Sequence, residues 1–166
     1  MNLAELMRED LICTDLVETS KETVLQALVD HLVDRGEVEN GDEVVRLLME
    51  REQLMTTGVR TDFAIPHAFS EHVHRSVVAL GYVRAGVDWQ SLDQQPVRYV
   101  FLLLGPPQSK GSHLRLLARL SRLLSSPAFV HHLAQAKSPG EMLEAVTAGE
   151  AELALNQRAS DAQGGR

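Results

Sequence analysis

The chain has 166 residues, 44% of them hydrophobic and 23% charged, and its formal net charge is −7. This length predicts one domain, and the acidic balance argues against binding to nucleic acid phosphates or to a membrane surface. The only cysteine, Cys13, excludes an internal disulfide, and no apolar run is long enough to cross a bilayer, so we expect a cytoplasmic protein without membrane insertion.

The first part of the chain predicts two elements before its first long helix. Residues 3–17 indicate a short helix, with an edge strand at residues 11–13. Thr19 and Glu22 have the spacing of a capping box, and the apolar residues that follow recur at helical spacing until Gly36. The capping box therefore predicts a helix from about Thr19 to Gly36.

A second long helix follows directly. Asn40 and Glu43 repeat the capping signal, and the helix is expected to end near Gln53. Arg51 lies in its last turn, where the helix dipole favours a cation even without a functional role. The predicted buried stripe consists of Val44, Val45, Leu47 and Leu48.

The next segment predicts a turn, a short strand and an exposed histidine. Gly58 after two threonines indicates the turn, and residues 63–65 form an apolar run of strand length. Pro66 has no N–H for a sheet ladder and should end that strand. His67 is then expected on a stiff backbone where the sheet edge meets solvent.

A histidine in this position has a specific chemical use. Near neutral pH an imidazole has one nitrogen with a free lone pair, while the other nitrogen can donate to a carbonyl or carboxylate. His67 is therefore a candidate nucleophile. The alternative is that it is simply a half-exposed polar residue.

The middle of the chain predicts two buried strands. Residues 69–75 read as a polar loop, and residues 77–83 have apolar side chains on both faces, as a central strand does. Gly86 indicates a turn, after which Trp89 is expected to pack in the core. Residues 97–104 form the clearest buried strand.

That last strand leads through a glycine-containing loop into a helix. The layout resembles a phosphate-binding loop, but Lys110 precedes Gly111 and the required residue order is absent, so no nucleotide cofactor is expected. Ser112 is predicted to cap the helix, with His113 in its first turn, where free N–H groups favour an anion. The alternative for His113 is a residue that only covers the helix start.

Two more helices complete the predicted fold. Ser126 with Pro127, and Ser138 with Glu141, have the signals of helix starts. Residues 1–155 are predicted as one domain and residues 156–166 as a disordered polar tail. The alternation of helices and strands predicts an α/β fold, a three-layer α/β/α sandwich with a mixed or mainly parallel sheet of about five strands and helices on both faces.

Several of these segments together resemble one protein family. They are Arg51-Glu52, Thr56-Thr57-Gly58, Ala64-Ile65-Pro66-His67, Val87-Asp88-Trp89, Leu92 to Val97 and His113 to Leu120. The pattern is similar to the enzyme IIA domains of the bacterial phosphoenolpyruvate:sugar phosphotransferase system, in the fructose, mannitol and nitrogen-regulatory class. Family members accept a phosphoryl group on the histidine of the Ala-Ile/Val-Pro-His motif.

The resemblance implies an activity and a set of site residues. His67 would accept a phosphoryl group from phospho-HPr, and His113 and Arg51 would donate hydrogen bonds to the phosphoryl oxygens. Thr56, Thr57 and Ser112 would add further donors. The chain would then be a phosphotransferase that acts as a regulatory phosphocarrier, passing the group to a IIB domain or signalling to a target protein, without a metal ion or another cofactor.

Departures from the family pattern bear on partner docking. Arg60, Asp62 and Phe63 replace residues that are usually glycine-rich, and Ala68 stands where glycine or serine is common. We expect a partner to dock on an apolar rim formed by Phe63, Ala68 and Phe69.

Three alternatives remain open at this point. The chain could be a sugar-specific IIA subunit of a fructose or mannitol permease, although the polar tail without an attached domain favours a regulator. It could be a binding module that keeps the fold without being phosphorylated. A metal site at His67, His72 and His74 is the third alternative, and it lacks a carboxylate or cysteine partner.

Overall fold

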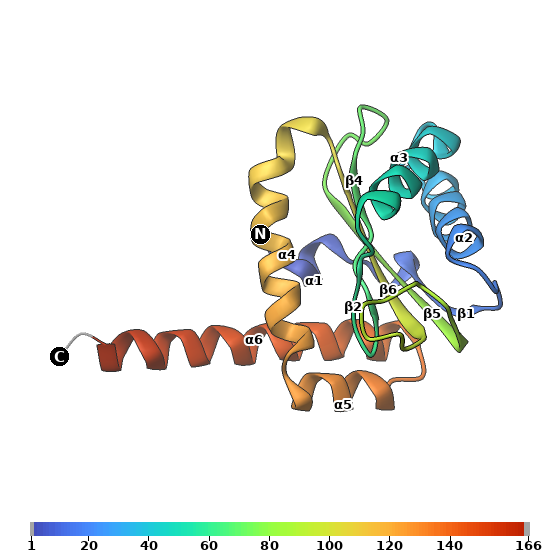
Figure 1. Cartoon of the computed structure of the whole chain (residues 1–166). Helices are drawn as coiled ribbons and strands as arrows, with labels where there is room; N and C mark the ends of the chain where they lie inside the picture. Colours follow the sequence, from blue (N-terminus) through green and yellow to red (C-terminus); the bar gives the residue numbers. More distant parts are fainter. Residues whose placement is uncertain (1, 165–166) are drawn as a thin grey trace.

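The computed structural model describes residues 2–164, in which a mixed sheet of six strands lies between two layers of helices (Figure 1). This confirms the predicted three-layer α/β/α architecture. Strands β5 and β6 are antiparallel, as are β2 and β3, and the other pairs are parallel. The order is β1 (Ile12–Leu16), β5 (Val77–Val87), β6 (Val97–Gly105), β3 (Asp62–Ala64) and β2 (Gly58–Arg60), with β4 (His67–Phe69) also paired with β6.

Each face of the sheet is covered by its own helices. Helices α2 (Lys21–Asp34) and α3 (Gly41–Leu54) pack on one face. The other face is covered by α1 (Leu3–Leu6), α4 (Lys110–Leu124), α5 (Pro127–Gln135) and α6 (Pro139–Gly164). Two short 3-10 helices, Glu9–Leu11 and Pro107–Ser109, precede β1 and α4.

The period-two alternation of the central strands divides the core between these two faces. On β6, Val100, Leu102 and Leu104 pack with α2 and α3, whereas Phe101 and Leu103 pack with the helices of the other face. Because β6 is buried on both faces, it appears in the sequence as a continuous apolar run. This is why it could be predicted almost residue by residue.

The caps of the first two long helices differ in how well they were predicted. Asn40 caps α3 as expected, accepting from the Glu43 N–H at 3.2 Å. The cap of α2 is Ser20 rather than Thr19: its hydroxyl accepts from the Thr23 N–H at 3.2 Å. Ser20 and Thr23 have the same spacing as the predicted pair, shifted by one residue.

Two glycines predicted as turns lie within strands. Gly58 begins β2, and the β2–β3 hairpin reverses at Asp62, whose φ is 72°. A side chain at Gly58 would overlap Ser91, so glycine is required here for close packing against the loop between β5 and β6. Gly86 adopts a φ of 76° inside β5, where the register with β6 shifts. The polar loop predicted at residues 69–75 begins at Ser70, because Phe69 is the last residue of β4.

The polar C-terminal segment is helical where the structure describes it. Helix α6 continues to Gly164, and its outer half extends away from the body of the molecule (Figure 1). The sequence predicts disorder from residue 156, whereas the structure describes residues 156–164 as helical; residues 165 and 166 lie outside the described part. These residues form a helix although their side chains are exposed. The domain boundary at residue 155 stays a prediction.

None of the helices within residues 2–164 is long and apolar enough to span a membrane.

Candidate functional site

His67 is the first residue of β4 and not a residue beyond the sheet. It pairs with Leu103 of β6, and the Leu103 N–H donates to the Pro66 carbonyl at 3.0 Å. The strand predicted at residues 63–65 is β3, Asp62–Ala64, which ends one residue earlier than expected; Ile65 and Pro66 separate it from β4, where the chain re-enters the sheet. Ala68 packs on the α2–α3 face, so His67 and Phe69 point to the α4 face.

The orientation of the His67 ring defines its free nitrogen. Nδ1 lies 2.9 Å from the Ile65 carbonyl oxygen. A carbonyl can only accept a hydrogen bond, so Nδ1 must carry the proton. In the neutral ring Nε2 then has the lone pair, and the half-buried side chain leaves this nitrogen as the nucleophilic atom.

His113 lies in the first turn of α4, as predicted, and its side chain is only 1% exposed. Ser76 Oγ is 3.0 Å from its Nε2, and Nδ1 has no hydrogen-bond partner within residues 2–164. Burial lowers the pKa of the His113 imidazole, and charge on His67 lowers it further, so the two rings are electrostatically coupled. The Phe69 ring centre is 5.0 Å from that of His113. The fold thus gathers His67, Phe69, Ser76 and His113 at one place.

Two of the residues that build this site were missed by sequence reasoning. Ser76 is a single serine before β5 and has no motif around it. Gly105 ends β6, and a side chain there would overlap His113 Nε2 and Ser109 Oγ. A glycine at the end of a buried strand could have suggested a close approach of another group, but the sequence did not identify which group.

Arg51 lies in the last turn of α3, which packs against β4. Its guanidinium is 3.4 Å from the Met55 carbonyl and is partly exposed. The helix that carries Arg51 is therefore adjacent to the strand that begins at His67. This placement is compatible with the predicted role of Arg51, which stays a prediction.

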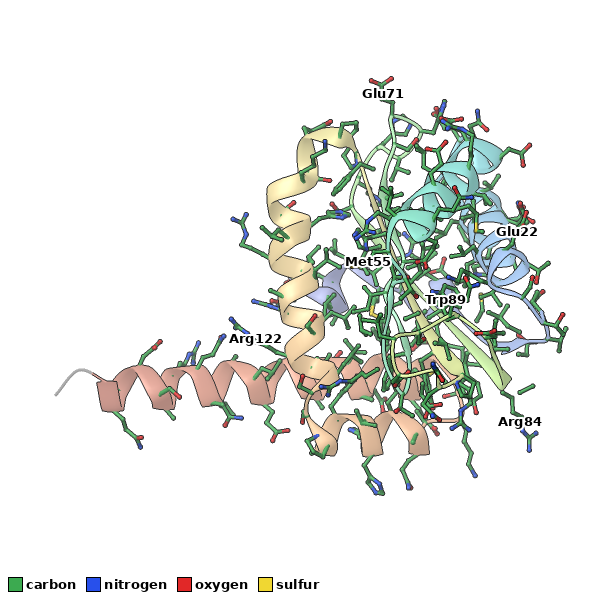
Figure 2. All side chains as sticks on the ribbon, in the orientation of Figure 1. Glu22, Met55, Glu71, Arg84, Trp89 and Arg122 are labelled. Atoms are coloured by element: carbon green, nitrogen blue, oxygen red, sulfur yellow. The ribbon has the colours of Figure 1, made fainter. Side chains whose placement is uncertain are left out.

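The hydroxyls of Thr56 and Thr57 have partners within the protein. Thr56 donates to the Trp89 carbonyl at 3.0 Å. Thr57 is buried, donates to the Glu52 carboxylate and accepts from the indole N–H of Trp89 at 3.2 Å. Trp89 lies in the interior beneath α3 (Figure 2), as predicted. Both hydroxyl protons are thus already donated, and they hold the loop after α3 in place.

Ser112 does not cap α4. The helix begins at Lys110, after Ser109, and the Ser112 hydroxyl donates to the Ser109 carbonyl at 2.8 Å. The helix starts earlier than predicted because the preceding 3-10 turn, Pro107–Ser109, leads directly into it.

Two residues of the predicted docking rim are inaccessible. Phe63 is 2% exposed and stacks on Tyr99, and Ala68 is 7% exposed in the core beside α2 and α3. Both point inward because of the strand alternation, which could not be assigned before the strand pairs were known. Phe69 is half-buried and remains at the surface of the site.

Two of the three histidines considered as a metal site, His67 and His74, have different hydrogen-bond partners. His74 lies 2.6 Å from the Glu39 carboxylate and is exposed, whereas His67 is hydrogen-bonded to Ile65. Within the described residues 2–164, no three histidine, cysteine or acidic side chains gather as a metal site would require.

Known proteins are similar to this chain over most of its length. The chain is 33% identical over 129 residues to the fructose-specific EIIA component of Haloferax volcanii, covering 78% of this chain and 84% of that protein. It is 34% identical over 124 residues to the nitrogen regulatory protein of Bradyrhizobium diazoefficiens, covering 75% and 80%. The crystal structure of nitrogen regulatory protein IIA-Ntr from Neisseria meningitidis has a TM-score of 0.80 at 26% identity, covering 86% of this chain and 97% of that one.

The match to a family model extends over most of the chain. Two other relatives, both EIIABC components, are much longer, and this chain spans 23% and 22% of them. Residues 5–148 match the model described as phosphoenolpyruvate-dependent sugar phosphotransferase system, EIIA 2. This range contains His67, Ser76 and His113. The chain therefore belongs to the EIIA 2 family of the phosphoenolpyruvate-dependent sugar phosphotransferase system.

Proposed function

We propose that the chain is a phosphohistidine carrier that accepts a phosphoryl group from phospho-HPr on His67. The observation that carries this proposal is the hydrogen bond from Nδ1 to the Ile65 carbonyl, which in the neutral ring leaves the lone pair on Nε2. The family supplies the reaction class, a component of a phosphotransferase system. On this proposal the protein works as a phosphocarrier and not as an enzyme that turns over alone.

The proposed transfer is a single displacement at phosphorus. The Nε2 lone pair of His67 attacks the phosphorus of the donor phosphohistidine as the donor N–P bond breaks, and that electron pair returns to the donor ring. Nδ1 keeps its proton on the Ile65 carbonyl throughout. The charge on the equatorial phosphoryl oxygens needs hydrogen-bond donors and correct positioning, and the step requires no metal ion or nucleotide.

We assign the donors to His113 and Arg51. His113 is buried beside His67, at the start of α4, where the helix dipole favours an anion. Arg51 can swing from its weak contact with Met55, because a distance of 3.4 Å marks a long hydrogen bond. Thr56, Thr57 and Ser112 take positioning roles, since their hydroxyls already donate to Trp89, Glu52 and Ser109.

The acceptor is proposed to be a IIB domain or a regulatory target protein in the cytoplasm. The IIA mannitol protein of Escherichia coli is solved in complex with phosphorylated IIB mannitol, which shows one such pairing for that protein. The similarity to the nitrogen regulatory proteins supports a regulatory role. The similarity to the Haloferax fructose-specific component supports the alternative of a sugar-specific IIA subunit. Transfer from the phosphorylated chain to a fructose-type IIB domain would favour that alternative.

The test is phosphorylation of the full chain with phosphoenolpyruvate, enzyme I and HPr. We expect wild type to acquire one acid-labile, base-stable phosphoryl group, and nitrogen-15 NMR should locate it on His67 Nε2. The His67→Ala variant should acquire none. His74→Ala, which removes an exposed histidine, serves as the matched control and should behave as wild type. A phosphorylated His67→Ala variant would exclude His67 as the carrier, and an unmodified wild type would instead favour a pure binding module.

A further inference from the structure

A cavity separate from the histidine site lies in the angle between α4 and α6, and we call it the α4–α6 pocket. Its volume is about 520 Å³, within the range of cavities that hold small molecules. Arg115, Arg119 and Arg122 line its α4 side. At 100° per residue, these arginines lie within about 60° of one another around the helix and opposite His113. The pocket is therefore on the far face of α4 from the histidine site.

One arginine of this group is part of the structure of the pocket. Arg119 donates to Asn2 Oδ1 at 2.5 Å and lies 3.5 Å from the Glu150 carboxylate. Glu150 is itself satisfied, since it accepts from the Leu3 and Ala4 N–H groups at 2.7 and 3.0 Å. This network joins α1, α4 and α6, and it neutralises the one carboxylate that lines the pocket.

The other two arginines are available for a ligand. Within residues 2–164, neither Arg115 nor Arg122 makes an ion pair or a side-chain hydrogen bond, and both are exposed. Three guanidinium groups and one carboxylate leave an excess of two positive charges, on a chain whose net charge is −7. Figure 2 shows Arg122 beside α6, at the angle between the two helices. Such a local concentration of arginine suits an anion of high charge.

The spacing of the two arginines indicates the shape of that anion. Arg115 and Arg122 are seven residues apart, which places them on the same face of α4 and about 10 Å apart along its axis. Arg119, which is held by Asn2 and Glu150, lies between them along α4, and the lining also includes the small apolar side chains of Ala118 on α4 and of Ala151 and Ala154 on α6. A single phosphate held as a forked pair by one of these arginines leaves the other arginine without a forked partner of its own. An anionic group at each end of a carbon skeleton would engage both.

We propose that the α4–α6 pocket binds an organic bisphosphate with a carbon skeleton of about six atoms. One phosphate lies on Arg115 and the other on Arg122, each as a forked pair of charge-assisted hydrogen bonds, and the skeleton covers the three alanines. The proposal does not depend on phosphoryl transfer at His67, because the pocket shares no side chain with that site.

The experiment is calorimetric titration of the full chain with three probes, at about 0.15 M ionic strength to suppress nonspecific attraction. The probes are fructose 1,6-bisphosphate, fructose 6-phosphate and inorganic phosphate. We expect one bisphosphate per chain, with affinity about tenfold above that of the monophosphate, since the latter gives up one forked contact. The amide NMR signals that shift should belong to α4 and the outer half of α6.

The matched variants are the double substitution Arg115→Gln with Arg122→Gln and the single substitution Arg84→Gln. Arg84 is also exposed and lies at the opposite end of the molecule (Figure 2). The double variant should lose the preference for the bisphosphate, with an unchanged circular dichroism spectrum, while Arg84→Gln and His67→Ala bind as wild type. Equal affinity for all three probes, no binding, or full binding by the double variant would overturn the proposal.

Discussion

At the residue scale, the environment of each histidine assigns it a different task. His67 is half-buried with one nitrogen fixed by a carbonyl, which suits a nucleophile. His113 is buried with a lowered pKa, which suits a neutral group that positions or donates. The two rings differ in burial and partners, although both are histidines near a helix or strand terminus. Environment, and not residue type, thus separates their roles.

Ser76 is predicted to position His113. In Ser76→Ala, the buried Nε2 of His113 loses its hydrogen-bond partner, and phosphorylation by HPr should slow about tenfold, the scale of one unsatisfied buried group. The measurements are the initial rate of phosphorylation and the NMR titration of His113, which a purely structural defect elsewhere would not shift. Ser121→Ala is the control, because Ser121 is an exposed residue of α4 about two turns away from His113. Equal rates for both variants would remove Ser76 from the site.

The burial of His113 also predicts a pH dependence of stability. Because its folded pKa is lowered, the unfolded chain binds a proton at this residue more readily than the folded one. The stabilising contribution is therefore complete above the ordinary histidine pKa of about 6.5 and is lost as pH falls below it. Denaturant unfolding at several pH values should show that the free energy of unfolding falls more steeply with decreasing pH for wild type than for His113→Asn. Parallel curves would place the acid sensitivity in other groups.

At the scale of elements, the helices were largely predictable from the sequence and the short strands were not. Capping residues and apolar spacing are local signals, so α3 was expected almost where it occurs, and the start of α5 at Ser126 and Pro127 was predicted correctly. Strands β2 and β4 have three residues each and exist through their pairing partners, which are distant in sequence. The burial of Phe63 and Ala68 follows from that pairing. No local pattern could have supplied it.

The junction between β6 and α4 gives the prediction at this scale. A side chain at Gly105 would overlap His113 and Ser109. Gly105→Ala should therefore destabilise the fold by about 1–3 kcal/mol, the usual cost of overpacking. The same variant should also be phosphorylated more slowly, because His113 is displaced. Gly111→Ala is the control, because no atom lies within 4 Å of its added methyl group and alanine favours a helix. Denaturant unfolding and the phosphorylation rate measure both effects. A Gly105→Ala variant as stable and fast as wild type would show that β6 and α4 can separate there.

At the scale of the whole molecule, the topology explains how residues far apart in sequence form one site. Strand β4 runs parallel to β6 and pairs with its last residues, and β6 then leads through a 3-10 turn into α4. His67, Phe69 and His113 therefore meet at the carboxyl ends of these strands, where open α/β sheets place their sites. The motif around His67 indicated the reactive residue and the family resemblance implied His113 as a donor, but only the strand order shows how the two residues come together.

The last prediction concerns docking of the proposed donor, phospho-HPr. Phe63 and Ala68 are buried, but Leu54 and Met55, which follow Arg51 in the sequence, are 83% and 63% exposed, and Leu114, which follows His113, is 70% exposed. We expect these three to form the docking rim, because an acidic chain gains little from net charge when it meets a partner and apolar contact can replace that attraction.

A charge on this rim should weaken docking without changing the chemistry at His67. Leu54→Glu and Leu114→Glu are each expected to raise the HPr concentration needed for half-maximal rate about tenfold, with the maximal rate unchanged. The reason is that a docking contact stabilises the ground state and the transition state equally, so its loss affects only this concentration. These sites are preferable to Phe69, whose ring packs against His113. Leu155→Glu on the outer half of α6, where leucine is 64% exposed, is the matched control. If all three variants behave alike, with normal circular dichroism spectra, the partner docks elsewhere. If only the maximal rate falls, these leucines support the site and not the partner.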